Sequence, residues 1–243
     1  MLIRLRRWPL LVGGVVYSSW VLAFVLPTGL SQRAAFTSEL EATGQPYAWL
    51  FRASDVVAGL LLALGAVAAL GWAARAPSRC APLLVLAFGA VAVTGVTNAL
   101  TGVLALDCTT SNGRCTRLRA AGVPSSWHHH AHLLVSNVSG YAFGVTVVAL
   151  VLVVLVFLRS DAPADGASFL PSGLRRALVL GAGLAALTAI PVSSALWPVS
   201  WRGFPQRINE AVESLLFVLL GLWAGRAAPV DRAAPVSSQR SRS

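Results

Sequence analysis

The sequence predicts an all-α polytopic membrane bundle of six transmembrane helices, with both termini in the cytoplasm. Composition is the first observation behind this prediction: 56% of the 243 residues are hydrophobic and only 12% are charged, about half the charged share of a soluble domain. The second is a series of apolar runs that reach the roughly 20 residues that a membrane-spanning helix needs. The third is that all 19 basic residues are arginines, most of which lie near the ends of these runs.

The apolar runs divide the chain into a single six-helix transmembrane domain, residues 1–225, and a tail. The first run is longer than the about 7–15 residues of a signal-peptide core, so we expect an uncleaved helix. The tail, residues 226–243, is mainly Ala, Pro, Ser and Arg, and we expect it to be disordered in the cytoplasm. The six expected spans are residues 8–30, 53–74, 82–106, 128–158, 177–197 and 208–225.

The arginines also indicate the orientation of the bundle. With both termini inside, 12 arginines face the cytoplasm and seven face out, as the positive-inside rule favours. Arginines spread over loop ends in this way set membrane orientation, so we expect no nucleic-acid partner. The absence of lysine, together with much Ala, Val, Leu and Gly, is typical of a GC-rich bacterial genome. We therefore expect a multi-pass protein of the bacterial plasma membrane.

The longest polar interruption between apolar runs is the loop 107–127, which the expected topology places outside the cytoplasm. It contains Cys108 and Cys115, separated by the turn-rich sequence TTSNGR. In an oxidising compartment, two cysteines at this spacing favour a disulfide, which would close a small loop and stiffen the outer cap. Cys80, at the cytoplasmic end of the third span, is expected to be a free thiol.

All four histidines follow this loop, in the sequence HHHAH at residues 128–132. His128 and His132 are four residues apart and share a helix face, and Asp107 could supply a third zinc ligand. The alternative is that the histidines hydrogen-bond to loop carbonyls at the helix end or respond to pH. We expect no cofactor, with zinc as the alternative. Ser136, Ser139 and Gly140 continue the face of His132 and are typical of close helix packing.

Charged side chains gather near the outer ends of the expected spans. Glu213 lies inside the sixth span, where a carboxylate is costly unless it is protonated or paired, and we expect Arg52, Arg207 or His132 as its partner. Arg207 can also pair with Glu210, three residues later. Intramembrane carboxylates indicate a functional site, and the alternative is an ion-pair network that holds the helices together. The candidate ligand-binding cluster consists of Arg52, Asp55, Asp107, His132, Arg207, Glu210 and Glu213.

Three motifs occur in an order that resembles a known family. Residues 38–55 read SELxxxGxPYxWLFRxxD, the DC…C loop runs into H-x3-S at His132 and Ser136, and GFPQRI at 203–208 opens the last span. This order resembles the uncharacterised bacterial membrane family called domain of unknown function 998, over roughly residues 8–225. The resemblance implies about six helices and no established activity. A more distant similarity to Frag1/DRAM/Sfk1-type six-helix proteins would imply a regulatory or lipid-organising role.

These observations favour a non-enzymatic protein whose outer cluster binds membrane lipid, a small polar ligand or a partner protein. Its mixed-sign charge suits a zwitterionic headgroup. One alternative is a metal-dependent membrane lipid hydrolase, with Glu213 or Asp55 as base beside a zinc held by His128, His132 and Asp107. Another alternative is a small transporter with Glu213 as the coupling site, although the chain lacks the internal repeat of many transporters. Nothing in the sequence indicates the oligomeric state.

Overall fold

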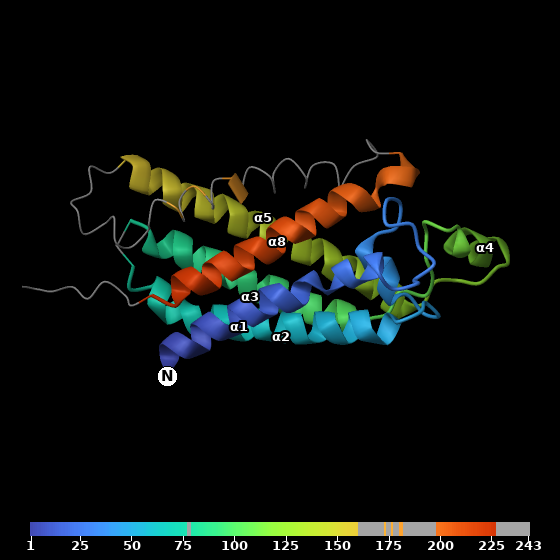
Figure 1. Ribbon diagram of the computed structural model, residues 1–243, viewed down its shortest axis with the longest axis horizontal. Coiled ribbons are helices and arrows are strands. Elements are labelled where there is room, and N and C mark those ends of the chain that lie inside the picture. Colours follow the sequence, from blue (N-terminus) through green and yellow to red (C-terminus); the bar gives the residue numbers. More distant parts are fainter. Residues whose placement is uncertain (77–78, 160–172, 174–175, 177–179, 182–197, 227–243) are drawn as a thin grey trace, which may run out of the picture.

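The computed structural model describes residues 1–76, 79–159, 173, 176, 180–181 and 198–226. These residues form helices and no strands, so the prediction of an all-α fold is confirmed. The long helices of the described part lie side by side along the long axis of the molecule (Figure 1): α1 (Leu2–Tyr17), α2 (Ala48–Ala73), α3 (Ala81–Val103), α5 (Trp127–Arg159) and α8 (Gly203–Ala224). The short helix α4 (Arg114–Ala120) lies beyond one end of the bundle, and the N-terminus lies at the other. We call these the disulfide end and the N-terminal end.

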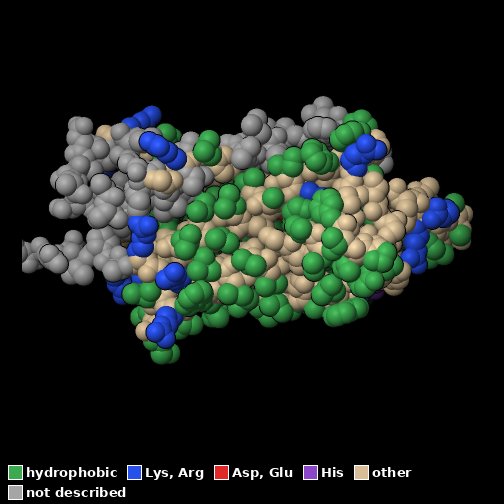
Figure 2. Space-filling model, viewed as in Figure 1, with side chains coloured by type: hydrophobic (Ala, Val, Ile, Leu, Met, Phe, Trp, Pro, Cys, Tyr) green, Lys and Arg blue, Asp and Glu red, His purple; other side chains and the backbone are tan. Residues whose placement is uncertain are grey.

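Three helices of the described part are long and apolar enough to cross a membrane: Ala48–Ala73, Ala81–Val103 and Trp127–Val156. They correspond to the second, third and fourth expected spans. Leucine and valine side chains remain exposed along them, including Leu60 and Val148. Figure 2 shows hydrophobic side chains over the middle of the visible face, with basic side chains mainly toward its two ends. An apolar surface of this extent is a liability in water and suits contact with lipid tails.

The first and last expected spans differ from the observed helices. α1 is α-helical for only 16 residues and continues as the 3-10 helix η1 (Ser18–Phe24). The switch occurs at a serine whose hydroxyl donates to Gly14 O at 3.4 Å, a local bond that competes with regular helix geometry. α8 begins at Gly203, five residues before the expected start at 208, and carries three charged side chains. The expected fifth span, 177–197, lies outside the described residues except for 180–181, as does the tail beyond Arg226.

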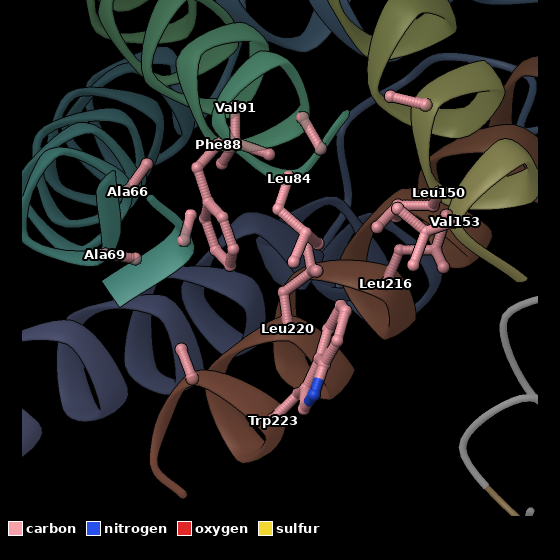
Figure 3. Packing of buried hydrophobic residues seen from close by; sticks show 14 of the residues in the cluster. Ala66, Ala69, Leu84, Phe88, Val91, Leu150, Val153, Leu216, Leu220 and Trp223 are labelled. Carbon is pink, nitrogen blue, oxygen red and sulfur yellow. The ribbon is translucent and has the colours of Figure 1, made fainter. Parts of the chain in front are cut away.

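The main hydrophobic core fills the bundle toward the N-terminal end (Figure 3). Trp72 of α2 meets Phe88 of α3 and Trp223 of α8 edge-to-face, with ring centroids 5.9 and 5.4 Å apart. Neighbouring long helices pack in the order α5, α3, α2, α1, α8. The rings of Phe143 on α5 and Phe217 on α8, with centroids 6.1 Å apart, join the first and last helices of this order. Buried aromatic pairs of this kind add to the stability that area burial provides.

Helices α2 and α3 pack with their backbones in close approach. A Cβ atom on Gly95 of α3 would lie 2.5 Å from Ala63 N and 2.7 Å from Gly59 O of α2. Small residues on both helices therefore make this interface possible, as in many membrane helix pairs. The tight pair fixes the positions of Asp55 on α2 and Asn98 on α3, which lie toward the disulfide end.

Arg6 ties the N-terminal end of the bundle together. Its guanidinium donates to Ala224 O at the end of α8 and to Arg226 O at 2.7 Å. It also lies over the Trp72 ring, 5.5 Å from the centroid. Basic side chains near a helix C-terminus satisfy carbonyls that have no partner within the helix. This end of the bundle is therefore closed by an arginine and the aromatic core.

Candidate functional site

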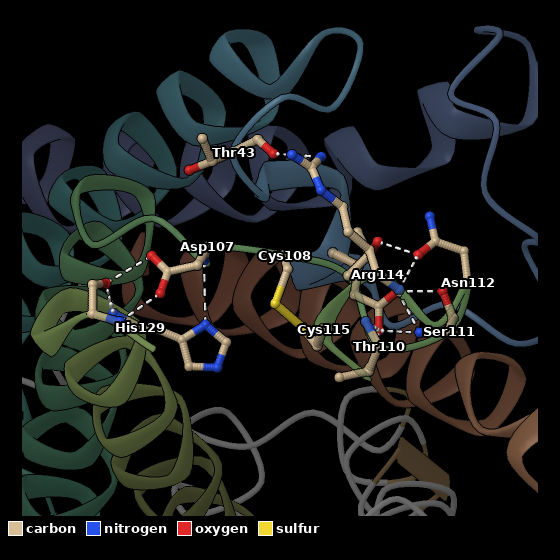
Figure 4. Close-up of a disulfide and its surroundings, with 12 residues drawn as sticks. Thr43, Asp107, Cys108, Thr110, Ser111, Asn112, Arg114, Cys115 and His129 are labelled. Carbon is tan, nitrogen blue, oxygen red and sulfur yellow. Dashed lines mark hydrogen bonds between the residues drawn. A yellow bond between two sulfur atoms is a disulfide. The ribbon is translucent and has the colours of Figure 1, made fainter. Parts of the chain in front are cut away.

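The disulfide expected between Cys108 and Cys115 is present, and it belongs to a cap over the disulfide end (Figure 4). The capped loop includes α4, a short helix that the turn-rich sequence did not predict. The loop is bonded to segment 25–47, which joins η1 to α2, because Thr43 N donates to Leu106 O at 2.8 Å and Arg114 donates to Thr43 O at 3.1 Å. Segment 25–47 and the disulfide loop thus form one unit.

Glu39 of the 3-10 helix η2 (Thr37–Glu41) connects this helix to the disulfide loop. Its buried carboxylate accepts hydrogen bonds from the backbone N–H and the hydroxyl of both Thr110 and Ser111. These bonds, the Glu39 network, satisfy a buried carboxylate without an arginine. They also fix η2 against the disulfide loop, and this fixes the neighbouring residue Glu41.

Asp107 and His128 belong to the cap and do not line the cavity described below. Asp107 accepts from Ser126 N at 2.6 Å and Ser126 Oγ at 2.7 Å, and its own N–H donates to His129 Nδ1 at 3.2 Å. His128 Nδ1 lies 3.4 Å from Asp107 Oδ1. Partial burial acts to raise the pKa of Asp107, but the Ser126 bonds and the nearby imidazoles hold that pKa below its usual value. Asp107 therefore fixes the start of α5.

The two arginines of the candidate cluster also lie outside the cavity lining. Arg52 Nε donates to Glu41 O at 2.7 Å. Arg207 is buried and donates to Ala35 O at 2.6 Å and Gln32 Oε1 at 2.8 Å. The pairing that we expected between Arg207 and Glu210 is wrong, because the guanidinium donates to Ala35 and Gln32 of segment 25–47. Both arginines hold loop backbone in place.

The remaining four members of the cluster, Asp55, His132, Glu210 and Glu213, line one cavity of about 190 Å³ at the disulfide end. The cavity lies between α1, α2, α3, α5 and α8 and is covered by residues of η1 and η2. Its size is below the roughly 300 Å³ at which drug-sized sites begin, so it suits a headgroup or a small metabolite. The candidate cluster is thus divided between a cavity lining and a structural cap.

Glu213 is held by neutral side chains. Tyr17 of α1 donates its hydroxyl to Glu213 Oε2, and Asn209 Nδ2 donates to Glu213 Oε1 at 2.6 Å. The expectation that an arginine or His132 would pair with Glu213 is therefore wrong. An intramembrane carboxylate can be satisfied by hydrogen-bond donors from neighbouring helices, and the aromatic hydroxyl that provides one here carries no charge to identify it in the sequence.

Glu210 and Glu41 each keep one carboxylate oxygen without a partner. Thr37 donates its hydroxyl to Glu210 Oε1, whereas Glu210 Oε2 and Glu41 Oε2 are buried and unbonded among the described residues. Glu41 also contacts Asp55 directly. Burial raises the pKa of Glu41 from 4.5 to about 7, because the charged form loses its hydration. The hydrogen bond with Asp55 and the charge of Arg52 act to lower this pKa, and the nearby carboxyl of Glu210 acts to raise it.

Glu41 is the main lining residue that was absent from the candidate cluster. It lies between two expected spans, and the sequence does not show whether such a side chain points inward. The one available signal was the spacing of Glu39 and Glu41, which on a short helical turn direct their side chains to different sides. One joins the cap and the other joins the cavity.

His132 closes the cavity from α5. Its Nδ1 faces Leu104 O at 2.6 Å, and its Nε2 is buried without a partner among the residues described. Ser136, Ser139 and Gly140 follow on the same face and line the cavity as well, where the spacing had indicated only helix packing. Among the described residues no three His, Cys, Asp or Glu side chains form a group that could hold a metal ion, and the zinc alternative stays a prediction.

α3 lines the cavity with two polar side chains, Asn98 and Thr101. Asn98 Nδ2 donates to the backbone oxygen of Asp55 at 3.0 Å, which links α3 to α2 beside the cavity. Thr101 lines the cavity too, but its hydroxyl donates to Asn98 O at 2.6 Å. The threonine hydroxyl therefore bonds to a carbonyl of its own helix, as threonines in membrane helices commonly do.

Long apolar helices, an apolar outer surface and a buried polar cavity define an α-helical membrane protein. Within that class, the chain belongs to the family described as protein of unknown function (DUF998), whose model matches residues 10–223. The family resemblance of the three sequence motifs is thus confirmed. No curated protein and no solved structure matches the chain.

Proposed function

We propose that this protein is a non-enzymatic ligand-binding membrane protein, and that the cavity at the disulfide end is its binding site. The observation that carries the proposal is that buried polar atoms of Glu41, Glu210 and His132 line one cavity and have no partner among the residues that the structure describes. A buried unpaired polar atom costs about 1–3 kcal/mol, so three of them in one place are an expensive arrangement for stability alone. A polar ligand would satisfy them.

In this proposal the disulfide end faces out of the cytoplasm of a bacterial cell, and both termini lie inside. The disulfide supports this orientation because such bonds persist in oxidising compartments. The bias of 12 arginines against seven in the loops supports it independently. The cavity would then lie in the outer half of the membrane, within reach of a lipid headgroup or a solute from outside. The hydrolase and transporter alternatives stay predictions.

The proposal is tested by native mass spectrometry of the purified full-length chain. Ser136→Phe would fill part of the cavity, whereas Leu134→Phe, on an exposed part of the same helix, provides the matched control. We expect a small molecule or lipid to co-purify with the wild type and the control and to be lost from Ser136→Phe. Equal retention by all three proteins, or no bound species in any of them, would contradict the proposed site.

A further inference from the structure

The lining of the cavity is one-sided in charge. Glu41, Asp55, Glu210 and Glu213 provide four carboxyl groups from η2, α2 and α8, and no arginine of the described chain lines the cavity. Carboxyl groups in contact, such as Glu41 and Asp55, resist carrying two charges unless a cation enters. The mixed-sign cluster expected from the sequence is therefore an acidic cavity with its arginines turned away.

The unpartnered atoms in this lining are mainly hydrogen-bond acceptors. Glu41, Glu210 and His132 are only 4%, 9% and 1% exposed, and they present Oε2, Oε2 and Nε2 without partners among the described residues. Because Leu104 O can only accept, His132 Nδ1 must carry the proton in that bond, and Nε2 of the neutral ring is an acceptor. Three acceptors from η2, α8 and α5 match the three N–H donors of a primary ammonium group.

Aromatic residues give a second indication of the same ligand class. Tyr17, Trp20 and Phe51 line the cavity together with the carboxyl groups, and aromatic faces attract organic cations. Trp20 Nε1 is buried and has no partner in the described part of the chain. Because indole N–H is a donor only, it calls for an acceptor on the ligand, such as the oxygen of an alcohol or its ester.

We propose that this cavity binds a protonated primary amino alcohol, either free or esterified in a lipid headgroup, with its ammonium group on Glu41, Glu210 and His132 and its oxygen on Trp20. This inference rests on the proposed function and names the ligand class of that site. A cavity of about 190 Å³ accommodates a group of this size and leaves the rest of a lipid outside.

The test is isothermal titration calorimetry of the purified full-length chain in detergent at neutral pH, with four probes of similar size. Ethanolamine carries both groups, ethylene glycol lacks the charge, glycolate reverses it, and choline keeps the charge without N–H donors. We expect ethanolamine to bind at least about tenfold more tightly than each of the others, the factor that loss of one good charged contact produces. Equal binding of any other probe would overturn the inference, and would leave the proposed function intact if binding is lost in Ser136→Phe.

Two conservative variants act on the site from separate elements. Glu210→Gln and Glu41→Gln should each weaken ethanolamine binding about tenfold. Asp107→Asn removes a carboxylate at the same end of the bundle but outside the cavity, so it should bind like the wild type. Wild-type affinity in both glutamine variants, checked for folding by size-exclusion chromatography, would overturn the assignment.

Lipid retention separates the two sources of the amine. The wild type is incorporated into nanodiscs that contain equal amounts of phosphatidylethanolamine and phosphatidylglycerol, then released and examined by native mass spectrometry. Preferential retention of phosphatidylethanolamine, lost in Glu210→Gln, assigns the site to the lipid headgroup. Binding of ethanolamine without lipid preference assigns it to a free amine. Neither ethanolamine binding nor preference for the amine-bearing lipid would overturn the inference.

Discussion

The two halves of the bundle handle buried groups in opposite ways. Toward the N-terminal end, aromatic and aliphatic side chains interlock, and the guanidinium of Arg6 closes the bundle on carbonyl oxygens. Toward the disulfide end, helices and loops surround a cavity in which two carboxyl groups each have an oxygen that no described residue contacts by a hydrogen bond. Another buried carboxylate at the disulfide end does have partners, because the Glu39 network provides hydrogen bonds to both oxygens of Glu39. The contrast therefore separates residues that stabilise the fold from residues available to a ligand.

The largest expected effect is at the contact of α2 and α3, which both halves share. In Gly95→Ala the added methyl would meet backbone atoms of α2, which cannot move aside as a side chain can. We expect a loss of at least about 3 kcal/mol, the upper part of the usual overpacking range, seen as a lower melting temperature in detergent. Gly89→Ala on the same helix meets nothing within 4 Å and should be neutral or slightly stabilising. Equal melting temperatures for the two variants would show that this contact is less tight than described.

The second prediction compares two glutamates of η2. Glu39→Gln replaces an acceptor oxygen with an amide that faces donors on Thr110 and Ser111, at a cost of about 1–3 kcal/mol. Glu41→Gln removes a buried carboxyl whose Oε2 has no partner in the described part of the chain, and should leave the melting temperature unchanged or higher at neutral pH. Thermal denaturation of both variants in detergent provides the comparison. A larger loss in Glu41→Gln would reverse the roles assigned to the two residues.

The third prediction concerns pH. Because burial raises the pKa of Glu41 to about 7 in the folded protein, the folded state binds this proton more tightly than the unfolded chain does. The corresponding stability is fully present below pH 4.5 and is lost as the pH rises to about 7. Melting temperatures measured across this window should fall with rising pH, and the fall should be smaller in Glu41→Gln. An equal slope in both proteins would assign the titration to other groups.

The smallest expected effect is at Asp107. Its folded-state pKa is lowered, so its contribution is present above its unfolded pKa and is lost as the pH falls through the folded value. Because Asp107 is partly exposed, we expect Asp107→Asn to cost only about 0.5–1 kcal/mol. The Ser126 amide donates a hydrogen bond to Asp107 Oδ2 at 2.6 Å, so faster hydrogen exchange at this amide would report the local change. Unchanged exchange there would contradict the assignment of Asp107 to the start of α5.

The sequence predicted the long helices because their signal is apolar length. α2 and α3 match the expected spans to within five residues at each end, since few residues interrupt the apolar runs. The change from α1 to η1 after Tyr17 was not predictable, because it depends on local hydrogen bonding. The disulfide followed from cysteine spacing and compartment. In contrast, α4 has no apolar face that could have indicated it.

The sequence predicted where along the expected spans the site residues lie, but not the direction in which their side chains point. Asp55, His132, Glu210 and Glu213 were recognised because ionisable residues are rare inside membrane spans, and the structure brings all four to one cavity. Periodicity does not tell which way a long side chain turns. For that reason Arg52 and Arg207 were assigned to the same cluster, although the fold directs both to loop backbone. The inward position of Glu41 depends on the contact between segment 25–47 and the disulfide loop, which no local pattern encodes.

The measurement that tests the central claim most directly is the melting temperature of ligand-free Glu210→Gln beside that of Glu39→Gln. The claim is that Glu210 serves binding, since its Oε2 has no partner within the described ranges and its Oε1 bond from Thr37 is retained by glutamine. The account predicts a Glu210→Gln melting temperature equal to or above that of the wild type, while Glu39→Gln is lowered. A Glu210→Gln loss as large as that of Glu39→Gln would show that the cavity carboxyls are part of the structural network, and would contradict the account.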